Sequence, residues 1–453
     1  MRLERESLLK KIDKFLYSVY YPLSVFILAA IFYILKLEVV GAIVLVAIIL
    51  FILITHRDTM PTLFPFLLVC VLPLRMYGSG EVWLKLLPLI AIVVPCLIFH
   101  FVYYRPKFSL GKMFFPYLAV SVAITLGGLF VVSPKNYFSP TSLYYIVGLG
   151  FGMLGLYVLL NAHIATAEKK YDLTDNITKI MLWFGGFLTL MVLVHFIENI
   201  EITITNGELV SPQMSNNLST NLLITMPFAF YYSKKCKYHT AMFMFGTLQY
   251  IAMIGTGSRG GILIGSIMFV LCVIYSMYIN DKVDRKFMVA CVICLFIIGI
   301  TFVIVKFDSI IETLEIKQGE ARLNLIRYAI RNFKNNPVFG VGLAHQGYYY
   351  HPQQGGLYWY HSSPLQVIAS MGVVGILSYG YQFVARLRML SKKRNIFTAC
   401  AMLSFFGLEL MSVVNPGIFC PLPYALTMVI IFIVVEKELL SKQNSNLSQT
   451  NSI

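Results

Sequence analysis

The 453-residue sequence has few charged residues, and acidic residues are the scarcer kind. Charged residues make up 13% of the chain and hydrophobic residues 58%, and the mean hydropathy is +0.74. Soluble domains carry about 25% charged residues, so this composition excludes a soluble protein and predicts an integral membrane protein. The 21 acidic residues stand against 36 basic ones, a net charge of +15. In a membrane protein such an excess indicates orientation, so we expect no nucleic-acid partner.

Patterns for cysteine and metal chemistry are also lacking. The eight cysteines are scattered, most of them inside apolar runs, and form no disulfide framework. The chain contains no Asp-x-Asp pattern, and the spacing of His345, His351 and His361 matches no standard set of metal ligands. We therefore expect neither a metal nor a cofactor.

Long apolar runs dominate instead. A membrane-spanning helix needs about 20 mostly apolar residues. Fourteen segments qualify, and they are 17–35, 39–55, 62–74, 86–103, 114–132, 143–163, 180–197, 218–232, 239–256, 260–279, 287–305, 364–383, 396–413 and 419–436. The third and eighth segments are short, so twelve spans is the alternative. The predicted fold is an all-α polytopic membrane protein of 12–14 transmembrane helices, with one long, partly helical extracytoplasmic loop.

Basic residues set the expected orientation. With a cytoplasmic N-terminus, most Lys and Arg residues, including Arg386 and Arg388, fall in cytoplasmic segments, as the positive-inside rule requires. Both termini are then cytoplasmic, and the polar tail 441–453 is expected to be disordered. The long loop 307–363 lies on the outer face.

The outer loop contains a predicted amphipathic helix over 320–336, stopped by Pro337. At 100° per residue, Arg322 falls with the apolar residues, so it is expected to point into the protein and to meet an anionic ligand or a structural ion pair. Arg327, Arg331 and Lys334 fall opposite, on a face open to solvent or lipid head groups. Tyr360 belongs to an aromatic group that either stacks on sugar rings or forms part of an interfacial belt.

Polar residues also gather at the outer ends of three spans. Arg259 lies between glycines at the start of the tenth span. It either binds an anion or extends its side chain to the membrane interface as a snorkelling anchor. Asn216 and Asn217 precede the eighth span, where they either cap its helix or bind a sugar or phosphate. His361 opens the twelfth span and can accept a proton at neutral pH, although a purely hydrogen-bonding role is the alternative.

Three segments together resemble the O-antigen ligase/polymerase superfamily, which includes ligases of the WaaL type and polymerases of the Wzy type. They are SRGG at 258–261, GEARLNLIRYAIRNFKNNPVFGVG at 319–342 and HSSPLQVIASMGVVG at 361–375. The resemblance implies roles for Arg259, Arg322 and His361, and it covers about a quarter of the chain. Ser362 departs from the family's usual asparagine and Ile326 from its common aromatic residue.

The resemblance implies a metal-independent, inverting glycosyltransferase of the bacterial plasma membrane, with its active site on the extracytoplasmic face. The donor would be a glycan on undecaprenyl diphosphate, and the acceptor a sugar hydroxyl on a lipid-linked glycan or lipid A core. Arg259 and Arg322 would clamp the diphosphate, His361 would be the base, and Asn216, Asn217, Arg327 and Tyr360 would bind substrate.

A ligase is slightly preferred over a repeat-unit polymerase, and a lipid-linked glycan flippase is the non-enzymatic alternative. The expected organisation is N-terminal helices over 1–257, a ligase-like core over 258–383, C-terminal helices over 384–440 and the cytoplasmic tail 441–453.

Overall fold

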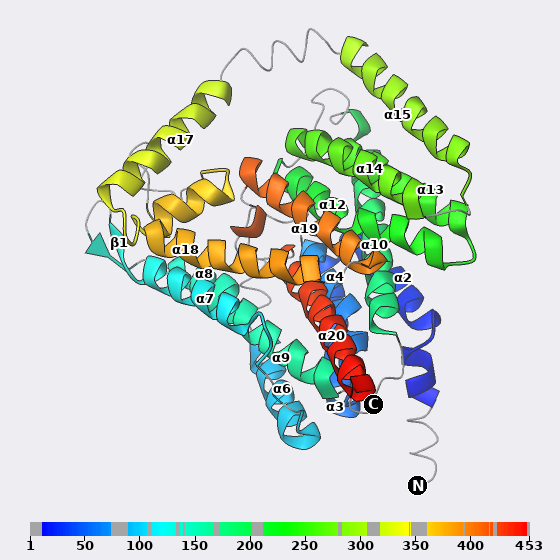
Figure 1. Ribbon diagram of the computed structural model, residues 1–453, viewed down its shortest axis with the longest axis horizontal. Coiled ribbons are helices and arrows are strands. Elements are labelled where there is room, and N and C mark those ends of the chain that lie inside the picture. The colour runs from blue at the N-terminus through cyan, green and yellow to red at the C-terminus, as the bar shows by residue number, and fades with distance from the viewer. Residues whose placement is uncertain are drawn as a thin grey trace. The chain divides into compact units, whose positions relative to one another are not determined.

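The computed structural model describes residues 11–73, 89–106, 108, 110–132, 136–138, 141–166, 172–201, 212–279, 283–305, 318–343, 345, 360–392, 395–415, 417–419 and 424–450. Helices account for nearly all of these residues (Figure 1). The strands are one antiparallel pair, β1 (Val131–Val132) and β2 (Asn136–Tyr137). The prediction of an all-α polytopic membrane protein is confirmed.

The chain forms two compact units, each built from several stretches of sequence. The first unit comprises residues 1–109, 159–229 and 245–265. Its helices are α2 (Tyr20–Ile34), α3 (Glu38–Thr55), η1 (Met60–Thr62), α4 (Leu63–Val71), α6 (Ile90–Tyr104), α10 (Leu173–Glu198) and most of α12 (Pro212–Lys235) and α13 (His239–Gly255).

The second unit comprises residues 110–158, 230–244 and 266–453. It contains α7 (Phe114–Leu129), the strand pair, α8 (Thr141–Tyr145), η4 (Ile146–Gly152), α15 (Arg285–Val305), α17 (Gln318–Asn335), α18 (Ser363–Lys392), α19 (Ile396–Val414), η6 (Gly417–Phe419) and α20 (Tyr424–Thr450). The helices α9 (Met153–Thr166) and α14 (Arg259–Ile279) each contribute to both units.

Each of the fourteen predicted spans overlaps a helix of the structure, and α17 confirms the helix predicted over 320–336. Five helices in the described part of the chain are both long and apolar enough to cross a membrane: α3, α10, α14, α18 and α19. Shorter apolar helices include α2, α6 and α7. The count of 12–14 spans stays a prediction.

The tail expected to be disordered is helical over much of its length, because α20 continues to Thr450. Extending an existing helix adds one hydrogen bond for each residue fixed, which costs far less than starting a new helix. The apolar first half of α20 therefore supplies the nucleus for its polar second half.

Candidate functional site

Helix α18 is broken near its start, and the break organises one side of the candidate site. Gly372 has φ 58° and ψ −147°, which no helix contains, and Figure 1 shows α18 bending near its N-terminal end. A break frees backbone groups that lipid cannot satisfy. Here the segment 337–343, which we call the strap, supplies their partners.

The strap bonds to α18 on both sides of the break. The N–H groups of Val373 and Val374 donate to the carbonyls of Pro337 and Val338 at 2.8 and 3.2 Å. In return, the N–H groups of Val341 and Gly342 donate to the carbonyls of Ala369 and Ser370 at 2.8 and 3.1 Å. The strap therefore replaces the lost helical bonds and ties the end of α17 to α18.

Glycine is required where the strap and the break meet. A Cβ on Gly372 would lie 2.4 Å from the carbonyl oxygen of Pro337, and one on Gly340 would lie 2.4 Å from the carbonyl carbon of Ser370. Both residues also have positive φ, which glycine alone adopts without strain. The Pro-x-x-Gly-x-Gly pattern of the sequence thus has a structural role in positioning α17.

His361 lies two residues before α18 begins and has φ 50°, a left-handed conformation that is uncommon for a residue with a side chain. Its neighbours hold it there. The backbone N–H of Tyr360 donates to Oε1 of the buried Gln366 at 3.2 Å, and Gln366 Nε2 donates to Ser370 Oγ at 3.1 Å. Strained residues of this kind cluster at functional sites.

Arg322 and His361 interact electrostatically. Burial by surrounding protein, followed by the positive charge of Arg322, lowers the pKa of His361 below its ordinary value of 6.5. Part of the His361 side chain still reaches solvent, and Arg322 is exposed. The structure therefore contains an exposed arginine whose positive charge acts on an exposed histidine and lowers the pKa of that histidine.

The expectation that Arg322 points into the protein interior is wrong, although its predicted helical face is correct. Arg322 lies two turns before Ala329, on the same face, and Ala329 is fully buried against Tyr360 and Ala369. The first turns of α17 extend beyond this packed region, so Arg322 remains exposed.

The predicted role of Tyr360 also needs correction. Its side chain is only 2% exposed, and Asn332 Nδ2 donates to its hydroxyl at 2.7 Å. A buried ring offers no face to a sugar, so Tyr360 joins α17 to the start of α18. Arg327 is exposed and donates from Nη1 to Asn324 Oδ1 at 3.2 Å.

The other candidate residues lie in the first unit, where α14 begins. Ser258 precedes this helix, and its Oγ accepts from the backbone N–H of Gly261 at 3.2 Å, as an N-cap does. The same hydroxyl donates to Oδ1 of Asn216 at 2.6 Å. This bond fixes the orientation of the amide, because the Asn216 oxygen must face Ser258 and the NH₂ group must face away.

Asn216 and Asn217 do not cap the helix that carries them, since α12 begins at Pro212 and both residues lie within it. Both are half-buried. Arg259 is the first residue of α14 and is exposed. The helix N-terminus, the arginine and the oriented amide of Asn216 all favour a negative charge at this point.

Sequence analysis missed a buried arginine. Arg386, expected in a cytoplasmic segment, lies inside α18 and is 4% exposed. Its Nη1 is 3.9 Å from Glu409 Oε1, and its Nη2 donates to the hydroxyl of Tyr117 at 3.3 Å. The rings of Phe405 and Phe432 lie 5.9 and 5.2 Å from its guanidinium.

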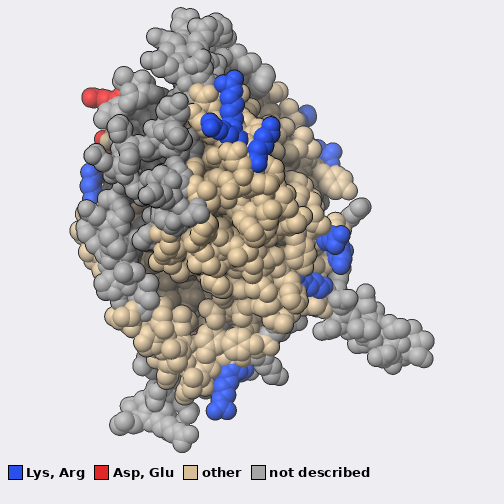
Figure 2. Space-filling model, turned by 90° about the vertical axis from the view of Figure 1, so that its left-hand side faces the viewer, with Lys and Arg blue, Asp and Glu red and all other residues tan. Residues whose placement is uncertain are grey.

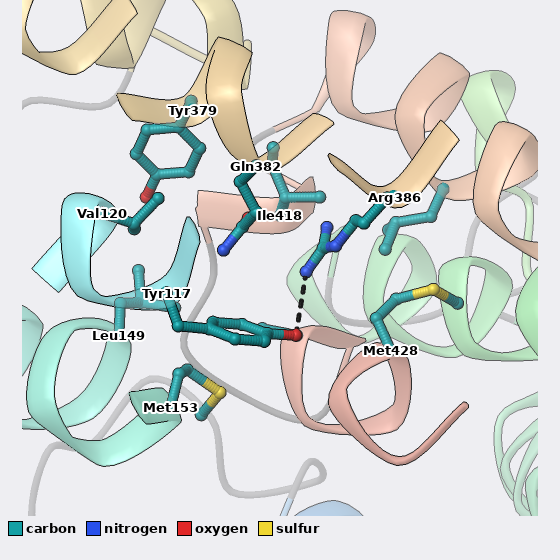
Figure 3. Close-up of a pocket in the computed structure, with 11 residues that line it drawn as sticks. Tyr117, Val120, Leu149, Met153, Tyr379, Gln382, Arg386, Ile418 and Met428 are labelled. Atoms are coloured by element: carbon teal, nitrogen blue, oxygen red, sulfur yellow. Dashed lines mark hydrogen bonds between the residues drawn. The ribbon is translucent and has the colours of Figure 1, made fainter. Parts of the chain in front are cut away.

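A small cavity adjoins Arg386 (Figure 3). Its volume of about 20 Å³ is enough for a single water molecule. Tyr117, Tyr379 and Gln382 line it together with Arg386. The cavity is far too small for a sugar, so this cluster is no substrate site. The signal that could have revealed it is the apolar sequence on both sides of Arg386.

Some predicted residues lie outside the described part of the chain. They are His351, Trp359 and Tyr348, Tyr349, Tyr350 and Tyr358 of the aromatic group. His345 is described, is half-buried and lies within hydrogen-bonding reach of the backbone of Val132.

Comparison with known families gives one match. Residues 241–380 match the family model described as O-antigen ligase. No curated protein matches the chain. The matched segment contains Arg259, Arg322 and His361, whereas Asn216 and Asn217 lie before it. The match supports the O-antigen ligase/polymerase superfamily, the family that the sequence resembles.

Proposed function

We propose that this protein, a membrane enzyme of the O-antigen ligase/polymerase superfamily that acts in polysaccharide assembly, transfers a glycan from a lipid diphosphate to a sugar hydroxyl. The observation that carries the proposal is the electrostatic interaction between Arg322 and His361. These two residues, distant in sequence from each other, are proposed to act together as an anion-binding group and a neutral base.

Arg322 is proposed to bind the diphosphate. When the glycosidic bond to the donor breaks, its electron pair stays with the diphosphate, which gains negative charge. An arginine presents several N–H donors to phosphate oxygens and stabilises this charge as it develops. Arg322 suits the role because its guanidinium is exposed.

His361 is proposed to be the general base. The acceptor hydroxyl attacks the anomeric carbon, a new C–O bond forms, and the hydroxyl proton passes to the imidazole. A base must be neutral before it can take a proton, and the lowered pKa of His361 keeps it neutral at pH 7. Direct displacement inverts the anomeric carbon and requires no metal.

Arg259 is proposed to bind donor phosphate as well. It lies at the N-terminus of α14, where backbone N–H groups favour anions. Asn216 is held by Ser258 with its NH₂ group directed away, so it is proposed as a donor to the same phosphate or its first sugar. Asn217 and Arg327 stay as proposed substrate contacts.

The proposed donor carrier is undecaprenyl diphosphate, and the proposed location is the bacterial plasma membrane, with cytoplasmic termini and an extracytoplasmic active site. A ligase is slightly preferred over a polymerase. Chromosomal deletion separates the two: loss of a ligase leaves full-length polymer on its lipid carrier, and loss of a polymerase leaves single repeat units on the acceptor.

The test is complementation of a deletion strain with Arg259→Lys, Arg322→Ala and His361→Ala, each expressed at wild-type level. Surface polysaccharide should fall steeply, since loss of a general base or a charge-stabilising group costs about 10²–10⁴-fold in rate. Arg388→Ala is the matched control, because it removes an exposed arginine of α18 that has no proposed substrate or lipid contact. Wild-type glycan from all three test variants would end the proposal.

A further inference from the structure

Helix α17 exposes a stripe of apolar side chains. Leu323, Ile326 and Ile330 are 46%, 40% and 43% exposed, although α17 packs against α18 through the adjacent face at Ala329. Positions three and four apart lie on one face of a helix, so these three residues form a continuous stripe. A soluble surface would expose no such row beside a packed face.

A basic row borders the stripe. Arg327, Arg331 and Lys334 lie at helical spacing and are exposed. Within the described residues no carboxylate pairs with any of them, and 321–335 contains no acidic residue. An apolar stripe beside a basic row is the pattern of helices that lie in the bilayer–water interface.

The stripe leads into the apolar side of a membrane helix. After α17 ends, Val338 and Phe339 of the strap are 53% and 54% exposed. The strap is bonded to α18 at Val373, whose side chain is 40% exposed, and Leu377, one turn further, is 67% exposed. Because α18 is long and apolar enough to span the membrane, lipid is the natural contact of this surface.

Figure 2 shows the charged side chains of the described residues on one face of the molecule. A broad area of the displayed face carries no Lys, Arg, Asp or Glu side chain, and basic side chains appear at its margins. Such a distribution matches an apolar lipid contact bordered by phosphate head groups.

We propose that α17 lies in the bilayer–water interface, with Leu323, Ile326 and Ile330 in the acyl layer and Arg331 and Lys334 bound to the phosphates of anionic lipids. The occupant of this surface is therefore the membrane. On the proposed function, this placement would hold Arg322 at the depth where the diphosphate of a lipid carrier lies.

The test is site-directed spin labelling of the full-length protein in nanodiscs that contain phosphatidylglycerol. The native cysteines are replaced, and single labels are placed at 323, 326 and 330. Labels at 324 and 335, which are exposed on other faces of α17, are the matched controls. The labels at 323, 326 and 330 should be more accessible to oxygen, which concentrates in lipid, than to a water-soluble nickel chelate. The control labels at 324 and 335 should be more accessible to the nickel chelate.

Charge tests the head-group contact. R331E/K334E should lower the oxygen accessibility of the label at 326, and so should replacing phosphatidylglycerol with phosphatidylcholine. Added inorganic phosphate should leave that accessibility unchanged if the ligand is a membrane head group. Equal nickel accessibility of the labels at 324 and 326 would overturn the proposal. Labels on the stripe that neither oxygen nor the nickel chelate reaches would also overturn it, because they would indicate that a protein partner covers the stripe. These readouts do not require glycan transfer, so they can fail while the proposed function stands.

Discussion

Two arginines of α17 and α18 lie in the same compact unit but in opposite surroundings. Arg322 is exposed and affects the titration of His361. Arg386 is buried, and its charge is met by Glu409, the Tyr117 hydroxyl and aromatic rings. An arginine already surrounded by protein partners has little left to offer a ligand, whereas an accessible one keeps its donors for phosphate.

The difference separates stability from function. Burial of a charge is costly unless the charge is paired, so removal of one partner leaves the other uncompensated. The Arg386 cluster should therefore respond to mutation through folding. The Arg322–His361 pair should respond through catalysis, because both residues are exposed and, among the described residues, neither side chain has a hydrogen bond or ion pair to lose.

The largest effect is expected at Arg386. Arg386→Met leaves the half-buried Glu409 without its cation and should lower the free energy of unfolding by about 3–5 kcal/mol. Thermal or denaturant unfolding in nanodiscs measures it. The control is Arg386→Met with Glu409→Leu, which removes both charges and should regain most of the stability. If Arg386→Met alone is as stable as the wild type but has lost glycan transfer, Arg386 acts in catalysis and not in folding.

A smaller loss of stability is expected at the break in α18. Gly372→Ala introduces a Cβ 2.4 Å from the Pro337 carbonyl oxygen in a backbone conformation that only glycine adopts easily. The strained backbone alone should cost about 1–3 kcal/mol. Gly380→Ala is the matched control in the same helix, where nothing lies within 4 Å of the added Cβ. Equal stability of the two variants would show that the strap does not restrain α18.

The smallest effect is expected at Tyr360, which connects the two elements of the functional pair. Tyr360→Phe keeps the buried ring but loses the hydrogen bond from Asn332, which should cost about 1 kcal/mol. Because Asn332 belongs to the helix that carries Arg322, a lower transfer rate with normal substrate affinity is also expected. If the rate is unchanged while stability falls, Tyr360 serves packing alone.

The apolar helices were predictable because a run of about 20 apolar residues has few alternatives to a membrane helix. The helix over 320–336 was predictable from its periodicity and Pro337. In the candidate site, sequence reasoning chose Arg322 and His361, and the positive charge of Arg322 lowers the pKa of His361. It also placed Arg322 on the correct face of α17.

What the sequence could not show depends on long-range contacts. Nothing in the local sequence distinguishes Gly372 from a helical glycine, since its partners belong to the strap at 337–343. Tyr360 is buried only because Ala329 and Ala369 meet it from two other helices. Arg386 looked like a flanking charge because Glu409, its partner, lies on the next helix.

The central claim, that His361 acts as a neutral base beside Arg322, is tested most directly by the pH dependence of glycan transfer in reconstituted protein. The wild-type rate should be constant near neutral pH and fall as the pH drops through the lowered pKa of His361, below 6.5. Arg322→Gln should move this decline to higher pH, since it removes a positive charge that opposes protonation. His361→Gln should be slow and should lack the decline. The same decline in His361→Gln as in the wild type would contradict the account.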